Sequence, residues 1–214
     1  MASMPDLVVE SIDALSERQR DLARVIYEDA FSAELRVPFD ELTLLGSTDQ
    51  TFVALDGKTP VGFAALRLLS SVQWSFLRFF AIDADRRSQA LGSRFWQLLQ
   101  PVLQTKAWPA NTVFEVEHPE EESVSEAERV IRERRIRFWT ACGACLLPAT
   151  SYMQPDYTAS GVTEPMLLMS ATPAAVEPPR GDELRALVLA IYTDRYGMSA
   201  DDPLVSVALA SITS

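Results

Sequence analysis

One stretch of the sequence constrains the fold more than any other, because it predicts a strand, a tight polar turn and the beginning of a helix in direct succession. It runs from Leu77 to Gln97 and reads LRFFAIDADRRSQALGSRFWQ. The apolar run Phe79–Ile82 is typical of a buried strand, and after a polar segment apolar residues recur at helical spacing, at Leu91, Phe95, Leu98 and Leu99. Backbone amides at the start of such a helix can bind an anion, so the stretch predicts a site for a group such as a diphosphate.

The turn between this strand and this helix carries the residue types that an anion site needs. Ala90 and Gly92 are small and let the backbone approach a ligand closely. Arg86, Arg87 and Arg94 add positive charge beside them. The same residues would also suit an ordinary arginine-rich connection, so the surrounding elements have to decide between the two interpretations.

The turn resembles that of a known family, the GNAT acetyltransferases, whose pattern is Arg/Gln-x-x-Gly-x-Gly/Ala. Here Arg87-x-x-Ala90-x-Gly92 has alanine for the first glycine, and Ile82-Asp-Ala-Asp-Arg-Arg87 is similar to the family's approach to the turn. The resemblance implies acetyl-CoA as the co-substrate and no metal, with the pyrophosphate on the turn and the pantetheine arm along the strand. By this resemblance the cofactor-binding residues are Phe80, Ala81, Ile82, Arg87, Ser88, Gln89, Ala90, Leu91, Gly92 and Ser93.

The elements predicted by periodicity follow an order similar to that of the same family. Strands are expected at Leu7–Ser11, Thr51–Leu55, Val61–Leu69, Val72–Ile82 and Thr112–Glu117, with a hairpin turn at Asp56-Gly57 and further extended segments at Leu146–Met153 and Pro165–Ser170. Helices are expected at Glu17–Phe31, Leu91–Gln104 and Ser125–Cys142, the last beginning with the capping box Ser125-Glu-Ala-Glu128. The resemblance implies an α/β fold with a mixed, mostly antiparallel central sheet, a splay between strands 4 and 5, and helices on both faces.

The chain has 214 residues, which is enough for one domain with a sizeable core. We assign residues 1–172 to a GNAT acetyltransferase domain, 173–181 to a proline-rich linker and 182–214 to a helical C-terminal extension. In the extension, Leu184, Leu187, Val188 and Ile191 recur at helical spacing. The sequence leaves three roles open for it: packing on the core, packing on a second subunit of a homodimer, or forming a lid over the acceptor site.

The chain departs from the family pattern at the end of the Ser125–Cys142 helix. Trp139 stands where the family usually has a tyrosine that protonates the departing thiolate, and Arg132 stands where asparagine is frequent. An indole N–H cannot release its proton near neutral pH, so Trp139 cannot serve as that acid. The reaction would need another acid or none.

Two carboxylates are the candidate general bases. In the strand Thr112–Glu117, alternation places Glu115 and Glu117 on one face, and burying two carboxylates is costly unless they have a function. In the fold that the resemblance implies, the thioester and the amine meet where strands 4 and 5 splay. Glu117, at the strand end, is therefore the first choice for the base and Glu115 the second, with a solvated or arginine-paired strand face as the alternative.

Other candidates for proton transfer are weaker. His118 is the only histidine and precedes Pro119, where a loop role is the more common one. Tyr152 and Tyr157 follow Trp139, and either hydroxyl could replace the missing acid. We name Tyr152 as the third catalytic candidate.

Composition mainly excludes classes of function. The net charge of −11 argues against nucleic acid as a partner and favours cationic acceptors. No apolar stretch reaches the ~20 residues that span a bilayer, and the first residues lack the pattern of a signal peptide, so we expect no membrane association and a cytoplasmic protein. Cys142 and Cys145 form a C-x-x-C pair at a predicted helix C-terminus, where the helix dipole raises thiol pKa values, so we expect a structural role.

These features together predict an acyltransferase that moves an acetyl group from acetyl-CoA directly to a primary amine of a small molecule or peptide. The alternative is a catalytically silent acyl-CoA-binding or regulatory module, which the tryptophan at position 139 favours. The acceptor itself cannot be derived from these residues.

Overall fold

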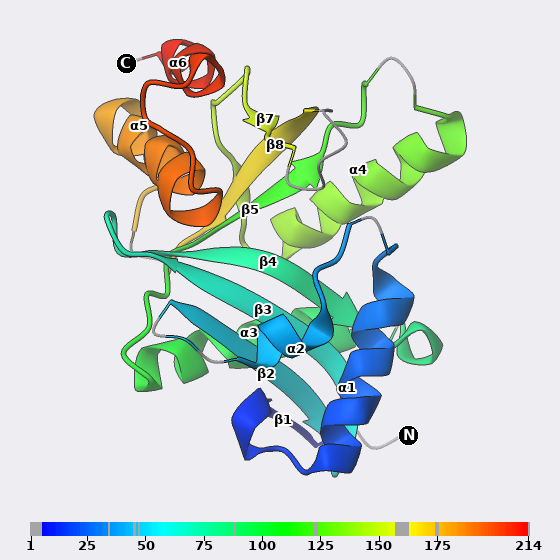
Figure 1. The fold of residues 1–214 in the computed structure, drawn as a ribbon. Coiled ribbons are helices and arrows are strands. Elements are labelled where there is room, and N and C mark those ends of the chain that lie inside the picture. Colours follow the sequence, from blue (N-terminus) through cyan, green and yellow to red (C-terminus); the bar gives the residue numbers. More distant parts are fainter. Residues whose placement is uncertain are drawn as a thin grey trace. The chain divides into compact units, whose positions relative to one another are not determined.

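The strands of the chain form one mixed sheet. The computed structural model describes residues 6–33, 35–44, 46, 48–87, 89–121, 124–156, 163–173 and 176–213. Within these, seven strands are hydrogen-bonded in the order β1-β2-β3-β4-β5-β8-β6, and the eighth, β7, pairs with β8. Their bounds are β1 Leu7–Ser11, β2 Asp49–Asp56, β3 Thr59–Leu69, β4 Trp74–Ile82, β5 Thr112–Glu117, β6 Cys145–Leu146, β7 Met153–Gln154 and β8 Glu164–Ala171 (Figure 1).

The pairing confirms the predicted fold class. β1–β2, β2–β3, β5–β8, β6–β8 and β7–β8 are antiparallel, whereas β4 and β5 are parallel. The parallel pairing joins Ser75 to Thr112 and Phe76 to Val113, at the beginning of both strands. Such a short pairing is what a splay between strands 4 and 5 requires.

The helices are α1 Glu17–Ala30, α2 Phe39–Thr43, α3 Leu91–Thr105, α4 Glu126–Ala141, α5 Gly181–Ala190 and α6 Pro203–Ala210, with a π-helical turn at Ile191–Arg195 and 3-10 turns at Ile12–Ala14 and Ala84–Arg86. Three of the helices, α1, α3 and α4, agree closely with the predicted ranges. The side chain of Ser125 accepts a hydrogen bond from the amide of Glu128, as the capping pattern predicted. Among the described residues, no helix combines the length and the apolar character that spanning a bilayer requires.

The chain divides into two compact units. Unit 1 contains residues 1–67 and 77–108, and unit 2 contains residues 68–76 and 109–214. The division at residue 172 made from the sequence remains a prediction.

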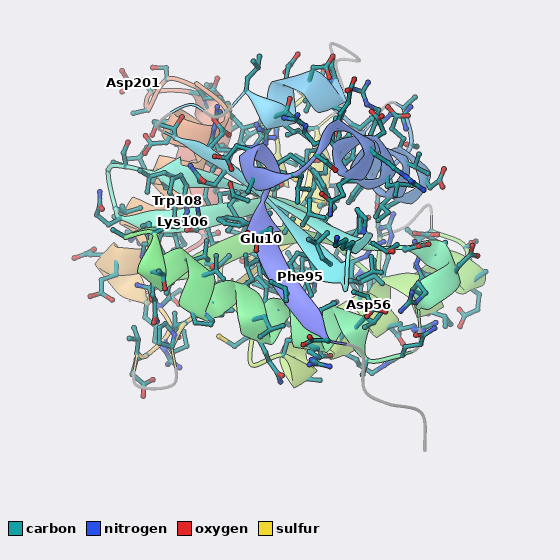
Figure 2. All side chains as sticks on the ribbon, turned by 90° about the horizontal axis from the view of Figure 1, so that it is seen from below. Glu10, Asp56, Phe95, Lys106, Trp108 and Asp201 are labelled. Carbon is teal, nitrogen blue, oxygen red and sulfur yellow. The ribbon has the colours of Figure 1, made fainter. Side chains whose placement is uncertain are left out.

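In unit 1, helices cover both faces of the sheet. Residues of α1, β2, β3 and β4 share a core that includes Tyr27, Val53, Phe63 and Phe79. Gly62 points to the opposite face, because neighbouring strand residues alternate, and there it meets the ring of Phe95 from α3. From below, α3 is seen to lie against β1 (Figure 2).

The β2–β3 hairpin begins one residue later than expected. Its two connecting residues are Gly57 and Lys58, and Gly57 has φ +61°. Two-residue hairpin loops need left-handed backbone, which glycine adopts without strain.

In unit 2, the C-terminal segment is helical, as predicted, and forms much of the core. α4 and α5 flank β5 and β8 (Figure 1). Phe114 of β5 contacts Trp139 of α4, whereas the neighbouring Val113 packs with α5 residues such as Leu184 and Leu187. The two helices therefore cover opposite faces of β5.

Candidate functional site

The predicted anion site begins at a strained residue. Ala90 is the N-cap of α3 and has φ +57° and ψ +13°, the left-handed conformation. This is the position where the family pattern has glycine, which adopts that conformation without a steric cost. The first turn of α3 contains no acidic residue and Ala90 offers no side-chain cap. The backbone amides of a helix beginning in this way suit an anionic ligand.

Two arginines brace the turn that leads to Ala90. The Arg86 guanidinium pairs with Asp56 at 2.5 Å, and Nε of Arg87 donates to the carbonyl of Ile82 at 3.4 Å. Asp83 accepts from the amide of Asp85 and so caps the 3-10 turn. Of the predicted cofactor-binding residues, Ser88 lies outside the described residues.

The strand before the turn is anchored by its side chains. The Phe80 ring stacks on Phe95 at 5.1 Å and meets Trp96 edge-on, and Ala81 is part of the unit 1 core. Among the described residues, β4 pairs with β5 only at Ser75 and Phe76. The main chain of residues 80–82 is thus held in place without help from a β5 pairing.

A group of polar side chains surrounds Glu115 in unit 2. Its Oε1 accepts from the hydroxyl of Tyr152 at 2.5 Å, and its Oε2 accepts from the amide of Gln154 at 2.7 Å. The hydroxyl of Tyr196 lies 2.9 Å from Oε1 and 2.8 Å from Oε2. The guanidinium of Arg195 lies over the ring of Tyr196 at 4.8 Å.

This environment raises the pKa of Glu115. Burial favours the neutral acid, and it outweighs the hydrogen bonds from Tyr152 and Tyr196, the charge of Arg195 and the hydrogen bond from Gln154, all of which favour the carboxylate. A carboxylate with a raised pKa is a stronger base than an exposed one, which suits a group that takes up a proton.

Glu117 lies in the opposite kind of environment. It forms an ion pair with Arg135 of α4. Burial favours its neutral form, but the Arg135 guanidinium outweighs burial, and the pKa of Glu117 is lowered. The two carboxylates therefore have different partners, and Glu117 is arginine-paired, which was the stated alternative.

The other candidates have defined positions. The hydroxyl of Tyr152 donates to Glu115, and burial raises the pKa of Tyr152 well above its usual value, which makes it a weaker acid. His118 accepts from the amide of Glu120 through Nδ1, while its carbonyl accepts from Arg132, so it shapes the turn after β5. Trp139 is buried against the Phe114 ring at 4.4 Å. Tyr157 lies outside the described residues.

Sequence reasoning missed Gln154, Arg195 and Tyr196. Gln154 and Tyr196 bond to Glu115 across 39 and 81 residues of sequence. One usable signal was present, since Tyr192 and Tyr196 are four residues apart in a segment predicted to be helical. Nothing in that spacing connects either tyrosine to β5.

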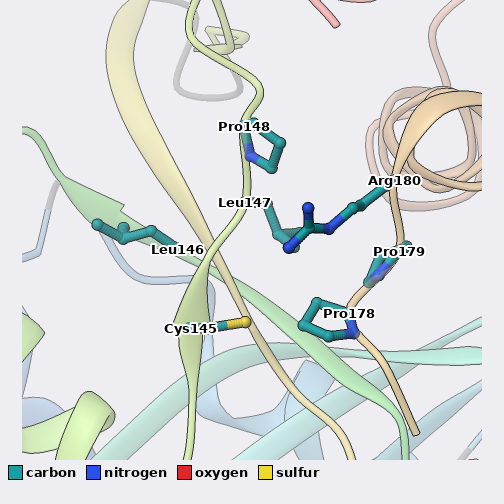
Figure 3. A pocket seen from close by; sticks show the side chains of 7 residues that line it. All are labelled: Cys145, Leu146, Leu147, Pro148, Pro178, Pro179 and Arg180. Atoms are coloured by element: carbon teal, nitrogen blue, oxygen red, sulfur yellow. The ribbon is translucent and has the colours of Figure 1, made fainter. Parts of the chain in front are cut away.

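A separate cavity of about 450 Å³ lies in unit 2, and its lining is Cys145, Leu146, Leu147, Pro148, Pro178, Pro179 and Arg180. The Cys145 thiol and the Arg180 side chain point toward it (Figure 3). Cys142 and Cys145 are not joined in a disulfide, and no predicted site residue lines the cavity. Over the described part of the chain, no cluster of histidine, cysteine or carboxylate side chains has a composition suited to a metal ion.

Comparison with known proteins identifies relatives of the sequence and of the fold. A sequence model described as the acetyltransferase (GNAT) family matches residues 13–129. A search of curated proteins found no match.

Three solved structures illustrate the likeness of the fold. A protein from Bacteroides thetaiotaomicron, described as of the GNAT family, is 20% identical, with a TM-score of 0.65 over 90% of this chain and 99% of its own. The aminoglycoside 6'-N-acetyltransferase from Enterococcus faecium is 16% identical, with a TM-score of 0.55 over 80% and 99%. A GNAT acetyltransferase from Elizabethkingia anophelis with acetyl-CoA bound is 11% identical, with a TM-score of 0.51 over 78% and 99%.

Proposed function

Because the chain belongs to the GNAT family of acetyltransferases, we propose that it transfers an acetyl group from acetyl-CoA directly to a primary amine of a small molecule or peptide. The observation that carries the proposal is the beginning of α3. There, a left-handed Ala90, Gly92 and a first turn without acidic residues follow a strand whose side chains are fixed. Such a helix N-terminus fits the diphosphate of CoA.

The cofactor-binding residues have distinct roles in this proposal. The first amides of α3, from Leu91 to Ser93, bind the pyrophosphate, and Arg87 braces the turn through its bond to Ile82. The main chain of Phe80, Ala81 and Ile82 holds the pantetheine arm. Acetyl-CoA supplies the activated thioester, and alignment of the amine with it can contribute ~7 to 11 kcal/mol to lowering the barrier.

We assign the general base to Glu115 rather than to Glu117. An acceptor amine is protonated near neutral pH and has to lose a proton before it can attack a carbonyl carbon. Glu115 has the raised pKa and is not ion-paired with an arginine of α4, whereas Arg135 holds Glu117 in its charged form. Glu115 accepts the proton at one carboxylate oxygen, directly or through water.

No tyrosine is needed as an acid in this mechanism. Trp139 packs in the core, and the hydroxyl of Tyr152 donates a hydrogen bond to Glu115. We therefore assign Tyr152 to holding the base, and the proton that the thiolate takes up comes from solvent.

The acceptor is expected to be cationic. A net charge of −11 attracts cations over a Debye length, and the transferable amine is itself an ammonium ion before deprotonation. Aminoglycosides, polyamines and basic peptides are the classes to test first.

The proposal is tested by titrating CoA into the wild-type chain and the Gly92→Asp variant, with turnover of acetyl-CoA followed over a panel of amines. A carboxylate in the first turn of α3 would repel the diphosphate, so CoA binding should be lost. The fold should be kept, because an acidic residue near a helix N-terminus is favourable. Gln104→Asp adds the same charge at an exposed site near the other end of α3 and should bind CoA normally. Equal CoA affinity in all three proteins would contradict the proposal.

The same measurements examine the alternative of a catalytically silent acyl-CoA-binding module. That module would bind CoA at the α3 turn and lose it in Gly92→Asp, yet it would turn over acetyl-CoA with no amine in the panel. The replacement of the family's usual tyrosine by Trp139 is the observation that favours it.

A further inference from the structure

The π-helical turn after α5 ends at a residue that contacts both carboxylate oxygens of Glu115. The hydroxyl of Tyr196 lies 2.9 Å from Oε1 and 2.8 Å from Oε2, and it accepts from the amide of Gln154 at 3.1 Å. Tyr152 and Gln154 each reach only one oxygen. Tyr196 therefore restricts rotation of the carboxylate about its last bond in a way that neither neighbour can.

A change of helix type places Tyr196 there. After Ala190 the helix continues as the π-helical turn, and the amide of Tyr196 bonds to the carbonyl of Ile191, five residues back. A π-helical turn rotates the following side chain relative to an α-helix, and such turns are frequent at functional sites.

The turn is fastened at several points within unit 2. Oδ2 of Asp194 accepts from the amide of Ser71 at 3.1 Å and from its hydroxyl at 2.9 Å. Ile191 is fully buried, and the ring of Tyr196 contacts Phe76 edge-on at 6.5 Å. A side chain fastened in this way can hold another group in place.

We propose that Tyr196 is a positioning residue for Glu115, fixing the carboxylate in the orientation from which it takes a proton from the acceptor amine. This inference rests on the proposed function. A donor shared between the two oxygens keeps the carboxylate plane constant, while Tyr152 and Gln154 fix its two ends. The three donors make four contacts with the carboxylate, which offers about four acceptor positions, so its orientation is defined at both oxygens.

Other polar and charged groups near Glu115 are accounted for. The positive charge of Arg195 favours the charged form of Glu115, and its guanidinium lies over the rings of Phe76 and Tyr196. From β5 and α4, Glu117 and Arg135 are paired with each other. Tyr192 packs its ring on Tyr152 at 5.2 Å, but its hydroxyl donates to the carbonyl of Met153 at 2.9 Å.

The test compares Tyr196→Phe with Tyr192→Phe in a pH profile of kcat/KM. Tyr196→Phe removes a donor that favours the charged carboxylate, so the acidic limb should move upward by about one pH unit. Below the limb kcat/KM should fall about tenfold further than above it, where only the loss caused by the less well oriented carboxylate remains. Tyr192→Phe removes a hydroxyl from the same turn that, within the described part of the chain, is hydrogen-bonded to the main chain of Met153, so it should lower stability without moving the limb.

A second variant provides an independent test in case Tyr196→Phe does not fold. Gln154→Met removes the donor to Oε2 and should move the limb in the same direction. If both variants fold and keep the wild-type limb, the inference is wrong even though the enzyme remains an acetyltransferase.

A readout without turnover separates this inference from the proposed function. In protein with 13C-labelled glutamate side chains, the Glu115 carboxyl signal, assigned by its loss in Glu115→Gln, should titrate at higher pH in Tyr196→Phe than in wild type. Absence of turnover with every amine would contradict the proposed function. The titration would still show whether the hydrogen bond from Tyr196 lowers the pKa of Glu115.

Discussion

Ala90 keeps the turn that we propose to bind CoA in a conformation that costs stability. A non-glycine residue in the left-handed region costs roughly 1–2 kcal/mol, and Ala90 has φ +57°. The sequence singled out this position, because alanine stands where the family pattern has glycine. It could not show that the alanine nevertheless adopts the conformation of glycine, since that depends on Asp83, Arg87 and the helix that follows.

Ala90→Gly should therefore stabilise the chain. Glycine costs ~0.4–1 kcal/mol of stability because it gives the unfolded chain more conformational freedom. Relief of the left-handed strain exceeds this cost, so we expect the free energy of unfolding to rise by about 0.5–1 kcal/mol. Denaturant unfolding at constant m-value measures it. Ala107, with φ +54° just after α3, is the matched control and should gain a similar amount as glycine. If glycine lowered stability at position 90 but raised it at position 107, the methyl group of Ala90 would have to make stabilising contacts that outweigh its strain.

Glu115 and Glu117 differ in how they should affect stability as pH changes. The folded pKa of Glu115 is raised, so its favourable contribution is complete below its unfolded pKa of ~4.3 and is lost as pH rises through the folded value. The folded pKa of Glu117 is lowered, so its contribution is present above ~4.3 and is lost as pH falls through the folded value. The two carboxylates thus have opposite signs of linkage.

Replacing each by glutamine should reveal those signs. Relative to wild type, Glu115→Gln should become more stable as pH rises from ~4 to 8, and Glu117→Gln should become less stable over the same range. Urea unfolding at several pH values measures both. Parallel curves for the two variants would show that their environments do not differ as described.

The same pair of variants separates the two carboxylates in catalysis. Glu115→Gln should lower kcat by ~100 to 10,000-fold, with a smaller loss at high pH, where free amine is abundant. Glu117→Gln should retain more activity, because Arg135 already prevents Glu117 from taking up a proton. The reverse order of activities would restore Glu117 as the preferred base.

At the scale of elements, periodicity predicted most of the fold. The β5 range was exact, and those of α1, α3 and α4 were correct to within one or two residues, because each has regular apolar spacing and a recognisable start. α2, with only five residues, was not predicted. The extended segment Leu146–Met153 proved to be parts of two short strands joined by turns.

The π-helical turn explains why part of the site could not be predicted. The spacing of Leu184, Leu187, Val188 and Ile191 correctly indicated a helix, and all four are buried. Regular 3.6-residue spacing assumes that every turn is α-helical, however, and no residue pattern marks the point where one extra residue enters. The contact between Tyr196 and Glu115 depends on that extra residue and on pairing across 81 residues.

At the scale of the whole molecule, the C-terminal segment belongs to the core of unit 2. Nine of the sixteen buried residues described for this core follow residue 181, among them Leu187, Ile191 and Val205. The sequence left three roles open for the segment because an amphipathic helix does not reveal which surface it covers. The observed packing is of the first kind, on the core.

Removal of the segment should therefore unfold unit 2 instead of opening a site. Leu187 is fully buried, and Leu187→Ala should cost ~2–5 kcal/mol, whereas Val207→Ala, at a site that is 58% exposed, should cost less than about 0.5 kcal/mol. A chain ending at residue 180 should lose hydrogen-exchange protection in β5 and β8, because their apolar side chains would lose the partners that cover them. If that shortened chain kept the protection of β5 and β8, the segment would be a removable extension, as the sequence-based boundary at residue 182 implies.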